Sequence, residues 1–178
     1  IMSVYGALIY MSSIPGGWIA DRITGTRGAT LIGGVLIIIG HICLSLPFAM
    51  FGLFTSMFFI IIGSGLMKPI ISNIVGRLYP QNDVRMDAGF VIFYMSVNFG
   101  ALVSPIILQH FINVKNFHGG FLIAAIGMAL GLIWYILFNR KNLGSVGMNP
   151  TKRLSQTEKK KYSIIVAEIN ALIAIELI

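Results

Sequence analysis

The sequence predicts an all-α protein, a polytopic bundle of helices that cross a membrane. Of its 178 residues, 56% are apolar and only 11% are charged, whereas an ordinary soluble domain has about 25% charged residues. The apolar residues also fall into long runs, and a run of about 20 residues is what a helix needs to cross the bilayer core. A soluble domain of this length could not bury so much apolar surface, so that class is excluded.

Five apolar runs are long enough to be transmembrane helices. They contain no Asp, Glu, Lys or Arg apart from Lys68, and the 20 glycines of the chain favour close packing between helices in lipid. Pro47 and Gly52 mark the turn between the second and third runs, which nearly abut. In chain order, the predicted spans are Ile1–Ala20, Ala29–Met50, Phe51–Val75, Ala88–Ile112 and Gly119–Phe138.

The basic residues predict how the spans are oriented. Eleven of the 13 Lys and Arg residues lie in the loops 21–28 and 76–87 and in the tail after residue 139. Because Lys and Arg are concentrated on the cytoplasmic side of membrane proteins, these segments are expected in the cytoplasm and the loop 113–118 outside. The first span then runs from the outside inwards, and the protein is expected to cross the cell membrane several times.

The chain is predicted to contain three segments. Residues 1–138 form a partial transmembrane bundle, and residues 139–162 form a basic cytoplasmic linker that contains Gly and Pro. Residues 163–178 are either the start of a further helix or an amphipathic helix at the membrane interface. Because the chain begins inside an apolar run and ends in one too short to span, we expect it to be part of a longer protein.

Lys68 lies in the middle of the third apolar run. It precedes Arg77 by nine residues, which places it about 13–14 Å from the cytoplasmic end of the helix. A lysine at the centre of a membrane helix costs about 2.5–3.5 kcal/mol on insertion scales, so Lys68 is expected to face a wet cavity or an acidic partner. Gly63–Gly65 and Pro69 on either side predict a kinked helix, which suits a transporter but also occurs as a static kink.

Two further polar side chains are expected at the same depth. Asn98 and Tyr10 each stand eleven residues from an acidic residue at the cytoplasmic end of their own span, about 16 Å along the helix. With Lys68 they predict a small-molecule site near the midplane, because an ammonium, an amide and a phenol together can bind a polar, carboxylate-bearing ligand. Tyr94, on the same helix face as Asn98, is a weaker candidate. The alternative is that Asn98 joins two helices and Tyr10 is an ordinary aromatic residue of the core.

A short loop with several glycines and charges follows the first span. A carboxylate and guanidinium groups in such a loop can lock neighbouring helix ends together, or they can be only an orientation signal. The residues predicted to form this conformational loop are Gly17, Asp21, Arg22, Gly25 and Arg27.

No residue pattern indicates an enzyme, a metal site or a cofactor. Cys43 is the single cysteine, and no phosphate-binding loop or nucleophile motif is present. His118 is expected in the outer loop, and His41 and His110 are expected to be packing residues. The net charge of +7 lies between apolar runs and not on one face, so nucleic acid is not an expected partner.

Three motifs resemble those of known transporters. Residues 16–27, Gly-Gly-Trp-Ile-Ala-Asp-Arg-Ile-Thr-Gly-Thr-Arg, resemble the loop between helices 2 and 3 of the major facilitator superfamily. Residues 63–72, which include Lys68, resemble the helix-4 lysine motif of the proton-dependent oligopeptide transporter family. Residues 90–102, which include Asn98, resemble the helix-5 signature of that family.

The resemblance implies that the five spans are helices 2 to 6 of the twelve-helix core, without the first helix and the C-terminal bundle. It implies proton symport of di- and tripeptides, with protons and the lipid bilayer as further partners. Lys68 would bind the peptide carboxylate and couple the proton, Asn98 would contact the peptide backbone, and Tyr10 would line the pocket. Ile70 stands where family members commonly have Asn, which changes the local polarity. The segment after residue 139 resembles the entry to an extra helix pair of bacterial members.

Other functions stay open on the residues alone. A related transporter for another small anion, such as nitrate, would share the fold. A non-transporting membrane assembly protein would pair Lys68 with a partner subunit and would bind no substrate saturably. A truncated product would transport nothing whatever its family. A membrane-embedded enzyme would need a nucleophile or a metal cluster, which the spans do not offer.

Overall fold

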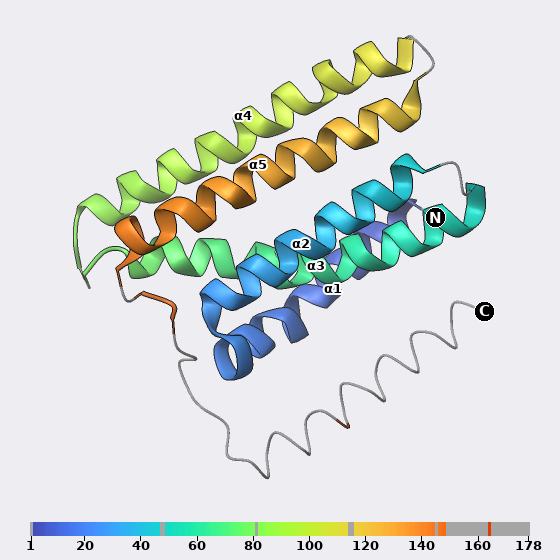
Figure 1. Cartoon of the computed structure of the whole chain (residues 1–178). Helices are drawn as coiled ribbons and strands as arrows, with labels where there is room; N and C mark the ends of the chain where they lie inside the picture. The colour runs from blue at the N-terminus through green and yellow to red at the C-terminus, as the bar shows by residue number, and fades with distance from the viewer. Residues whose placement is uncertain are drawn as a thin grey trace.

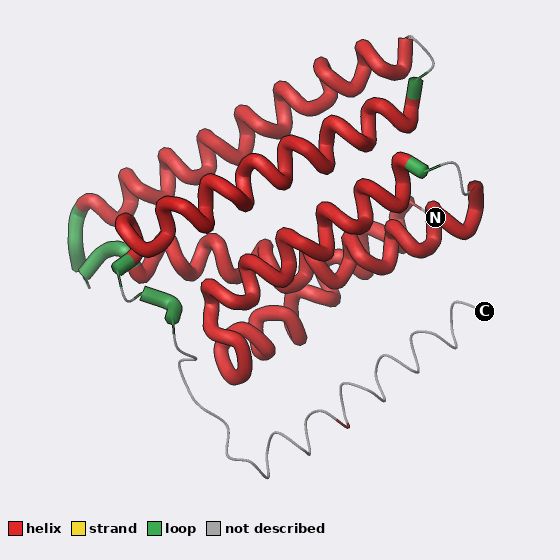
Figure 2. Tube along the Cα trace, in the orientation of Figure 1, coloured by secondary structure: helices red, strands yellow, loops and turns green. Residues whose placement is uncertain are grey.

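The computed structural model describes residues 2–46, 49–80, 82–113, 116–144, 146–148 and 164. In these residues the chain is helical apart from short turns (Figure 2). In chain order, the elements are α1 (Met2–Ile19), the π-helix η1 (Ala20–Thr24), α2 (Gly25–Ser45), α3 (Ala49–Arg77), α4 (Arg85–Asn113) and α5 (Phe117–Leu143). The predicted all-α fold class is confirmed.

The helices are long and apolar enough to cross a membrane. Four stretches of the described residues meet this criterion, and the first of them contains α1, η1 and α2 as one continuous helical run. Figure 1 shows the chain reversing its direction at η1, so that α1 and α2 are separate rods. The five α-helices therefore correspond to the five predicted spans.

Two predicted boundaries on the first half of the chain are wrong. The loop 21–28 is not open, because η1 and the first turn of α2 occupy it. Gly25, with a φ of 74°, separates the two helical segments, which is a conformation that favours glycine. Helix α2 ends at Ser45 and α3 begins at Ala49, so Met50 belongs to α3 and not to the preceding helix.

Helix α5 extends five residues beyond the predicted end of its span. It continues from Phe138 to Leu143, because the polar residues there are compatible with a helix that leaves the bilayer. It stops at Gly144, whose φ of 53° cannot continue a right-handed helix. At its other end, the Asn116 side chain accepts a hydrogen bond of 3.0 Å from the backbone N–H of Gly119, which caps the helix.

Helix α3 is the central helix of the bundle. It packs against both α1 and α2, and α2 in turn packs against α5. Figure 1 shows α4 and α5 side by side. The apolar window of α4 contains no buried residue. The core lies where α3 meets η1 and α2, and it consists of Ala20, Ala29, Leu66, Ile70 and Ile74.

Glycines allow α3 to approach its two neighbours closely. A Cβ on Gly33 of α2 would lie 2.7 Å from the carbonyl oxygen of Gly63. A Cβ on Gly16 of α1 would meet the backbone of Gly65 at a distance that real Cβ atoms do not reach. The prediction that small residues bring helices together is confirmed at these two crossings.

The turn between α3 and α4 carries an ion pair between Asp83 and the exposed Arg85 side chain. Asp83 accepts a hydrogen bond of 2.9 Å from the backbone N–H of Arg85 and another of 2.9 Å from its guanidinium Nη2. These bonds to the ionised form lower the pKa of the Asp83 carboxyl.

Candidate functional site

Lys68 and Tyr10 lie together in the structure. Lys68 comes from α3 and Tyr10 from α1, and the Lys68 Nζ lies 5.0 Å from the centroid of the Tyr10 ring. Both side chains are exposed, and Tyr10 keeps 72% of its surface open. Two of the three residues predicted to form a small-molecule site are therefore neighbours.

The direction of helical side chains explains this contact. Side chains on a helix tilt toward its N-terminus, so the long Lys68 side chain reaches back along α3 toward the level of Tyr10. On the next turns of α1, Gly17 faces Pro69, whose Cγ would lie 3.8 Å from a Cβ at position 17. The polar pair thus stands beside a tight helix crossing.

The geometry of the pair leaves the ammonium group able to bind a ligand. A cation over an aromatic face is stabilised by about 0.5–1 kcal/mol at an exposed site, and this contact uses none of the three N–H donors of a lysine. The ion pairs within the described residues join Arg77 to Asp21 and Arg85 to Asp83, and neither includes Lys68. Lys68 therefore presents a positive charge with free donors at an exposed face of α3.

Ile70 lies in a different environment from Lys68. It is 2% exposed and belongs to the core where α3 meets η1 and α2. An apolar side chain fits this position, because an amide there would need buried hydrogen-bond partners. The departure from the family pattern at Ile70 therefore changes the core and not the exposed face that carries Lys68.

Asn98 and Tyr94 both lie on α4. Both side chains are exposed, and the Tyr94 ring packs on Phe90 and Phe93 of its own helix, with centroid distances of 6.5 Å and 5.3 Å. The interactions of the described residues do not connect Asn98 with Lys68 or Tyr10. The role of Asn98 stays a prediction.

The conformational loop holds an ion pair to a neighbouring helix. Asp21, in η1, lies 3.6 Å from Arg77 at the end of α3, and both side chains are partly exposed. Arg77 also donates a hydrogen bond of 2.7 Å from Nε to the Asn73 side chain. Arg22 lies next to Asp21 in η1. From the sequence, Arg77 is expected only to mark the orientation of the helix. The signal that indicates its ion pair is its place at a helix end near a loop with an acidic residue.

Arg27 ties the start of α2 to the chain that follows α5. Its Nε donates to the Val146 carbonyl and its Nη2 to the Gly144 carbonyl, both at 2.7 Å. Its backbone N–H donates to the Gly147 carbonyl at 3.1 Å. Arg27 itself is 7% exposed, and its hydrogen bonds to the two carbonyl groups are partly buried. We call Arg27, together with Gly144, Val146 and Gly147, the Arg27 latch.

Gly147 is expected to be intolerant of a side chain. Its φ is 76°, and a Cβ there would collide with the Thr26 hydroxyl. A Gly147→Ala substitution should therefore lower the free energy of unfolding by roughly 1–2 kcal/mol, measured as a lower midpoint of thermal unfolding in detergent. The control is Gly131→Ala, which meets nothing within 4 Å. Equal midpoints for the two variants would contradict this expectation.

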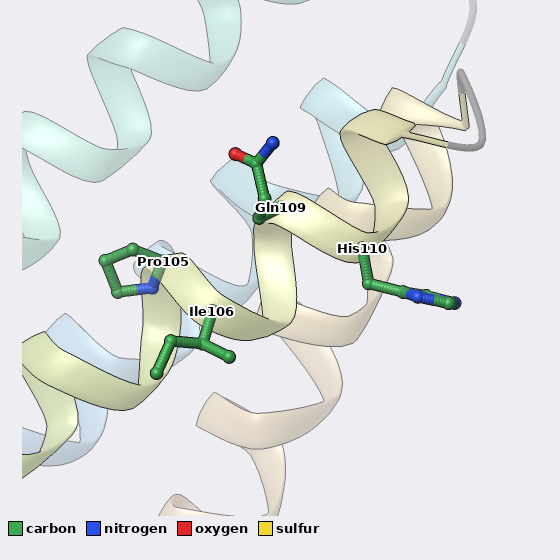
Figure 3. Close-up of a pocket in the computed structure, with 4 residues that line it drawn as sticks. All are labelled: Pro105, Ile106, Gln109 and His110. Atoms are coloured by element: carbon green, nitrogen blue, oxygen red, sulfur yellow. The ribbon is translucent and has the colours of Figure 1, made fainter.

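A shallow hollow lies at the far end of α4 and is unrelated to the Lys68 pair. It measures about 510 Å³ and is lined by Pro105, Ile106, Gln109 and His110. Figure 3 shows Gln109 and His110 pointing away from each other on one helix. Lining from a single exposed helix does not enclose a ligand, so the hollow is not a candidate binding site.

Metal chemistry has no support among the residues that the structure places. No group of three or more His, Cys, Asp or Glu side chains comes together there. His41 Nδ1 bonds to the Ile37 carbonyl of its own helix at 2.8 Å, and the His110 ring packs edge-on against Phe111. Both contacts lie within the histidines' own helices, and the packing role of His41 and His110 stays a prediction.

The chain matches known transporters along almost its whole length. The model of the POT family matches residues 28–163. The chain is 44% identical to the uncharacterized transporter YclF of Bacillus subtilis (strain 168), over 99% of this chain and 36% of that protein. It is 41% identical to a di-/tripeptide transporter of Lactococcus lactis subsp. lactis (strain IL1403), over 98% of this chain and 35% of that protein.

A solved structure has nearly the same arrangement of helices. It is a POT family transporter in complex with a thioalcohol-conjugated peptide, 80% identical in sequence, with a TM-score of 0.95. The match covers 99% of this chain and 36% of that one. The chain thus spans about a third of the length of the relatives that it matches.

Proposed function

The chain belongs to the POT family, and from this premise we propose that the protein containing it imports di- and tripeptides by symport with protons. The observation that carries the proposal is the exposed Lys68 ammonium over the Tyr10 ring, on helices that form a membrane bundle. A transporter function accounts for a lysine deep in a membrane helix, and the POT family is not a family of enzymes.

The orientation of the bundle follows from its charges. The chain is part of an integral, multi-pass membrane protein. We infer that the segments 21–28 and 76–87 and the chain after residue 139 are cytoplasmic, because eleven of the 13 basic residues lie there. The Asp21–Arg77 pair and the Arg27 latch then lie at the cytoplasmic ends of their helices.

The division of the chain into segments is also a proposal. Residues 1–138 form part of one transmembrane bundle, and the rest of the cavity comes from other parts of the protein. Residues 139–162 form a basic linker, of which the structure describes the end of α5 and the latch. The expected helix at 163–178 lies outside the described residues except for Ile164.

Substrate binding is explained by the exposed charge. The Lys68 ammonium donates charge-assisted hydrogen bonds to the peptide carboxylate, while the Tyr10 ring holds the other side of the cation. Lys68 couples the proton by pairing in turn with a protein carboxylate and with the peptide carboxylate. When the lysine leaves the protein carboxylate for the peptide, the protein carboxylate takes up the proton. That acid belongs to another part of the transporter, since the spans in this chain contain none.

The experiment that tests this function is dipeptide uptake into proteoliposomes with an imposed inward proton gradient. It uses the product of the complete reading frame that contains this chain. Accumulation of labelled dipeptide above equilibrium, abolished by a protonophore, is the expected result. Uptake of nitrate without uptake of dipeptide would instead support a transporter of small anions. Absence of any saturable binding would support an assembly protein or an inactive product.

Asn98 is proposed to hydrogen-bond the peptide backbone. Replacing it with alanine should raise the KM for dipeptide by about two- to tenfold, since a neutral hydrogen bond contributes about 0.5–1.5 kcal/mol. Ser96→Ala on the same helix is the matched control, because its hydroxyl already bonds to the Ile92 carbonyl at 2.9 Å. If both variants keep the KM of the unaltered transporter, Asn98 does not contact the substrate.

A further inference from the structure

The Tyr10–Lys68 pair stands beside the closest approach of α1 to α3. Gly16 lies against the backbone of Gly65, where neither helix has room for a Cβ. On the turn before, the Ser12 hydroxyl lies 2.9 Å from the Ile9 carbonyl oxygen of its own helix and 3.0 Å from the Ile61 carbonyl oxygen of α3, and its one proton is shared between these two acceptors. Tyr10 is two residues from this hydroxyl, and Lys68 is three residues from Gly65.

Neither member of the pair is held in place by its own burial. Tyr10 is 72% exposed, and Lys68 is exposed. Because Tyr10 belongs to α1 and Lys68 to α3, the distance from the ammonium to the ring depends on the separation of the two helix axes. That separation varies between about 8 and 10 Å according to the side chains at the contact.

The contact between Lys68 and Tyr10 tolerates only a small increase in the separation of the two helix axes. A cation is attracted to an aromatic ring within about 6 Å of its centroid, and the Lys68 Nζ lies at 5.0 Å. A methyl group at the crossing would move the axes apart on the order of 1 Å. That displacement is enough to take the ammonium to the limit of its interaction with Tyr10.

We propose that Gly16 and Gly65 are positioning residues, which hold α1 against α3 so that the Lys68 ammonium lies over the Tyr10 ring and faces the substrate carboxylate. The inference rests on the proposed role of this pair in binding peptide. In this proposal, two glycines that carry no functional group contribute to the specificity for a carboxylate, because they set the position of the Lys68 ammonium.

The chain offers a matched control on the opposite side of the same helix. Gly33→Ala adds a Cβ that would lie 2.7 Å from the Gly63 carbonyl oxygen, two residues from Gly65 on α3. It crowds α2 against α3, whereas Gly16→Ala crowds α1 against α3. Both variants strain a glycine carbonyl of α3, but only Gly16→Ala moves the helix that carries Tyr10.

The first test is dipeptide uptake by the complete transporter. Gly16→Ala is expected to raise the KM by about two- to fivefold, the worth of an exposed cation–π contact. Gly33→Ala should lower the midpoint of thermal unfolding comparably and leave the KM unchanged. If Gly16→Ala does not fold, Ser12→Ala replaces it and should shift the KM in the same direction. An equal KM in the Gly16 (or Ser12) and Gly33 variants overturns the proposal.

A second measurement is independent of transport. Reductive ¹³C-methylation of lysines keeps their charge, and the NMR signal of methylated Lys68, assigned with Lys68→Arg, should show an upfield ring-current shift. Tyr10→Leu should abolish that shift, Gly16→Ala should reduce it, and Gly33→Ala should preserve it. A shift unaffected by Gly16→Ala overturns the positioning role. A transporter that takes up no peptide but shows the expected shifts refutes the proposed function and leaves the positioning role supported.

Discussion

Replacing Lys68 by alanine is expected to abolish proton-driven accumulation of dipeptide while the transporter still folds. The ammonium is exposed and lies over the Tyr10 ring, so its removal leaves no buried group without a partner. The substrate carboxylate would lose a charge-assisted hydrogen bond of about 1.5–3 kcal/mol, which corresponds to roughly a 10- to 150-fold weaker interaction. Uptake into proteoliposomes and the midpoint of thermal unfolding measure the two effects separately.

Two control variants isolate the role of this lysine. Lys68→Arg keeps the positive charge but presents a bulkier, planar group with a different geometry, so peptide binding should survive better than accumulation. Lys141→Ala removes the same charge from the C-terminal end of α5, where the side chain is exposed, and should leave uptake unchanged. A Lys68→Ala transporter that still concentrates dipeptide would exclude Lys68 from the coupling mechanism.

Arg27→Ala is expected to cause a large loss of stability. Arg27 is 7% exposed, and its side chain donates to two carbonyl oxygens at 2.7 Å. Hydrogen bonds to charged groups contribute about 1.5–3 kcal/mol each. Because some backbone relaxation offsets the loss of two such bonds, we expect the free energy of unfolding to fall by about 3 kcal/mol.

The geometry of the latch also predicts the effect of a conservative change. Arg27→Lys keeps the charge, but a single ammonium cannot reproduce the fork that spans both carbonyls, so it should recover only part of the stability. Arg85→Ala is the control, because its side chain is 78% exposed in a surface ion pair, and such pairs contribute little. If thermal unfolding gave the same midpoint for Arg27→Ala and Arg85→Ala, the latch would have no stabilising role.

The candidate site could be predicted from the sequence only in part. Lys68 was identified by a local rule, since a charge inside an apolar run is costly wherever the helix packs. Tyr10 and Asn98 are predicted members of the same site because they lie at the same depth as Lys68. Depth, however, does not determine which face of a helix a residue occupies. The structure brings Tyr10 to Lys68 because α1 packs tightly on α3, and it leaves Asn98 on the exposed helix α4.

The partners of Arg27 could not be predicted from the sequence at all. They are backbone carbonyls, which every residue has, and they lie 117 and 119 positions away along the chain. The structure pairs Asp21 with Arg77 and joins Arg27 to Gly144 and Val146. The sequence does not identify these partners, and the role of the loop in conformational change stays a prediction.

The sequence by itself determined the membrane class, the five helices and the deep lysine, because these depend on apolar length and local cost of charge. Helix ends were predicted less well, since η1 and the extension of α5 depend on backbone conformations at Gly25 and Gly144. Only the tertiary structure decided which polar residues meet. Those contacts depend on how far apart the helix axes lie, and the separation is set by pairs of residues on different helices, such as Gly16 and Gly65, that no local pattern connects.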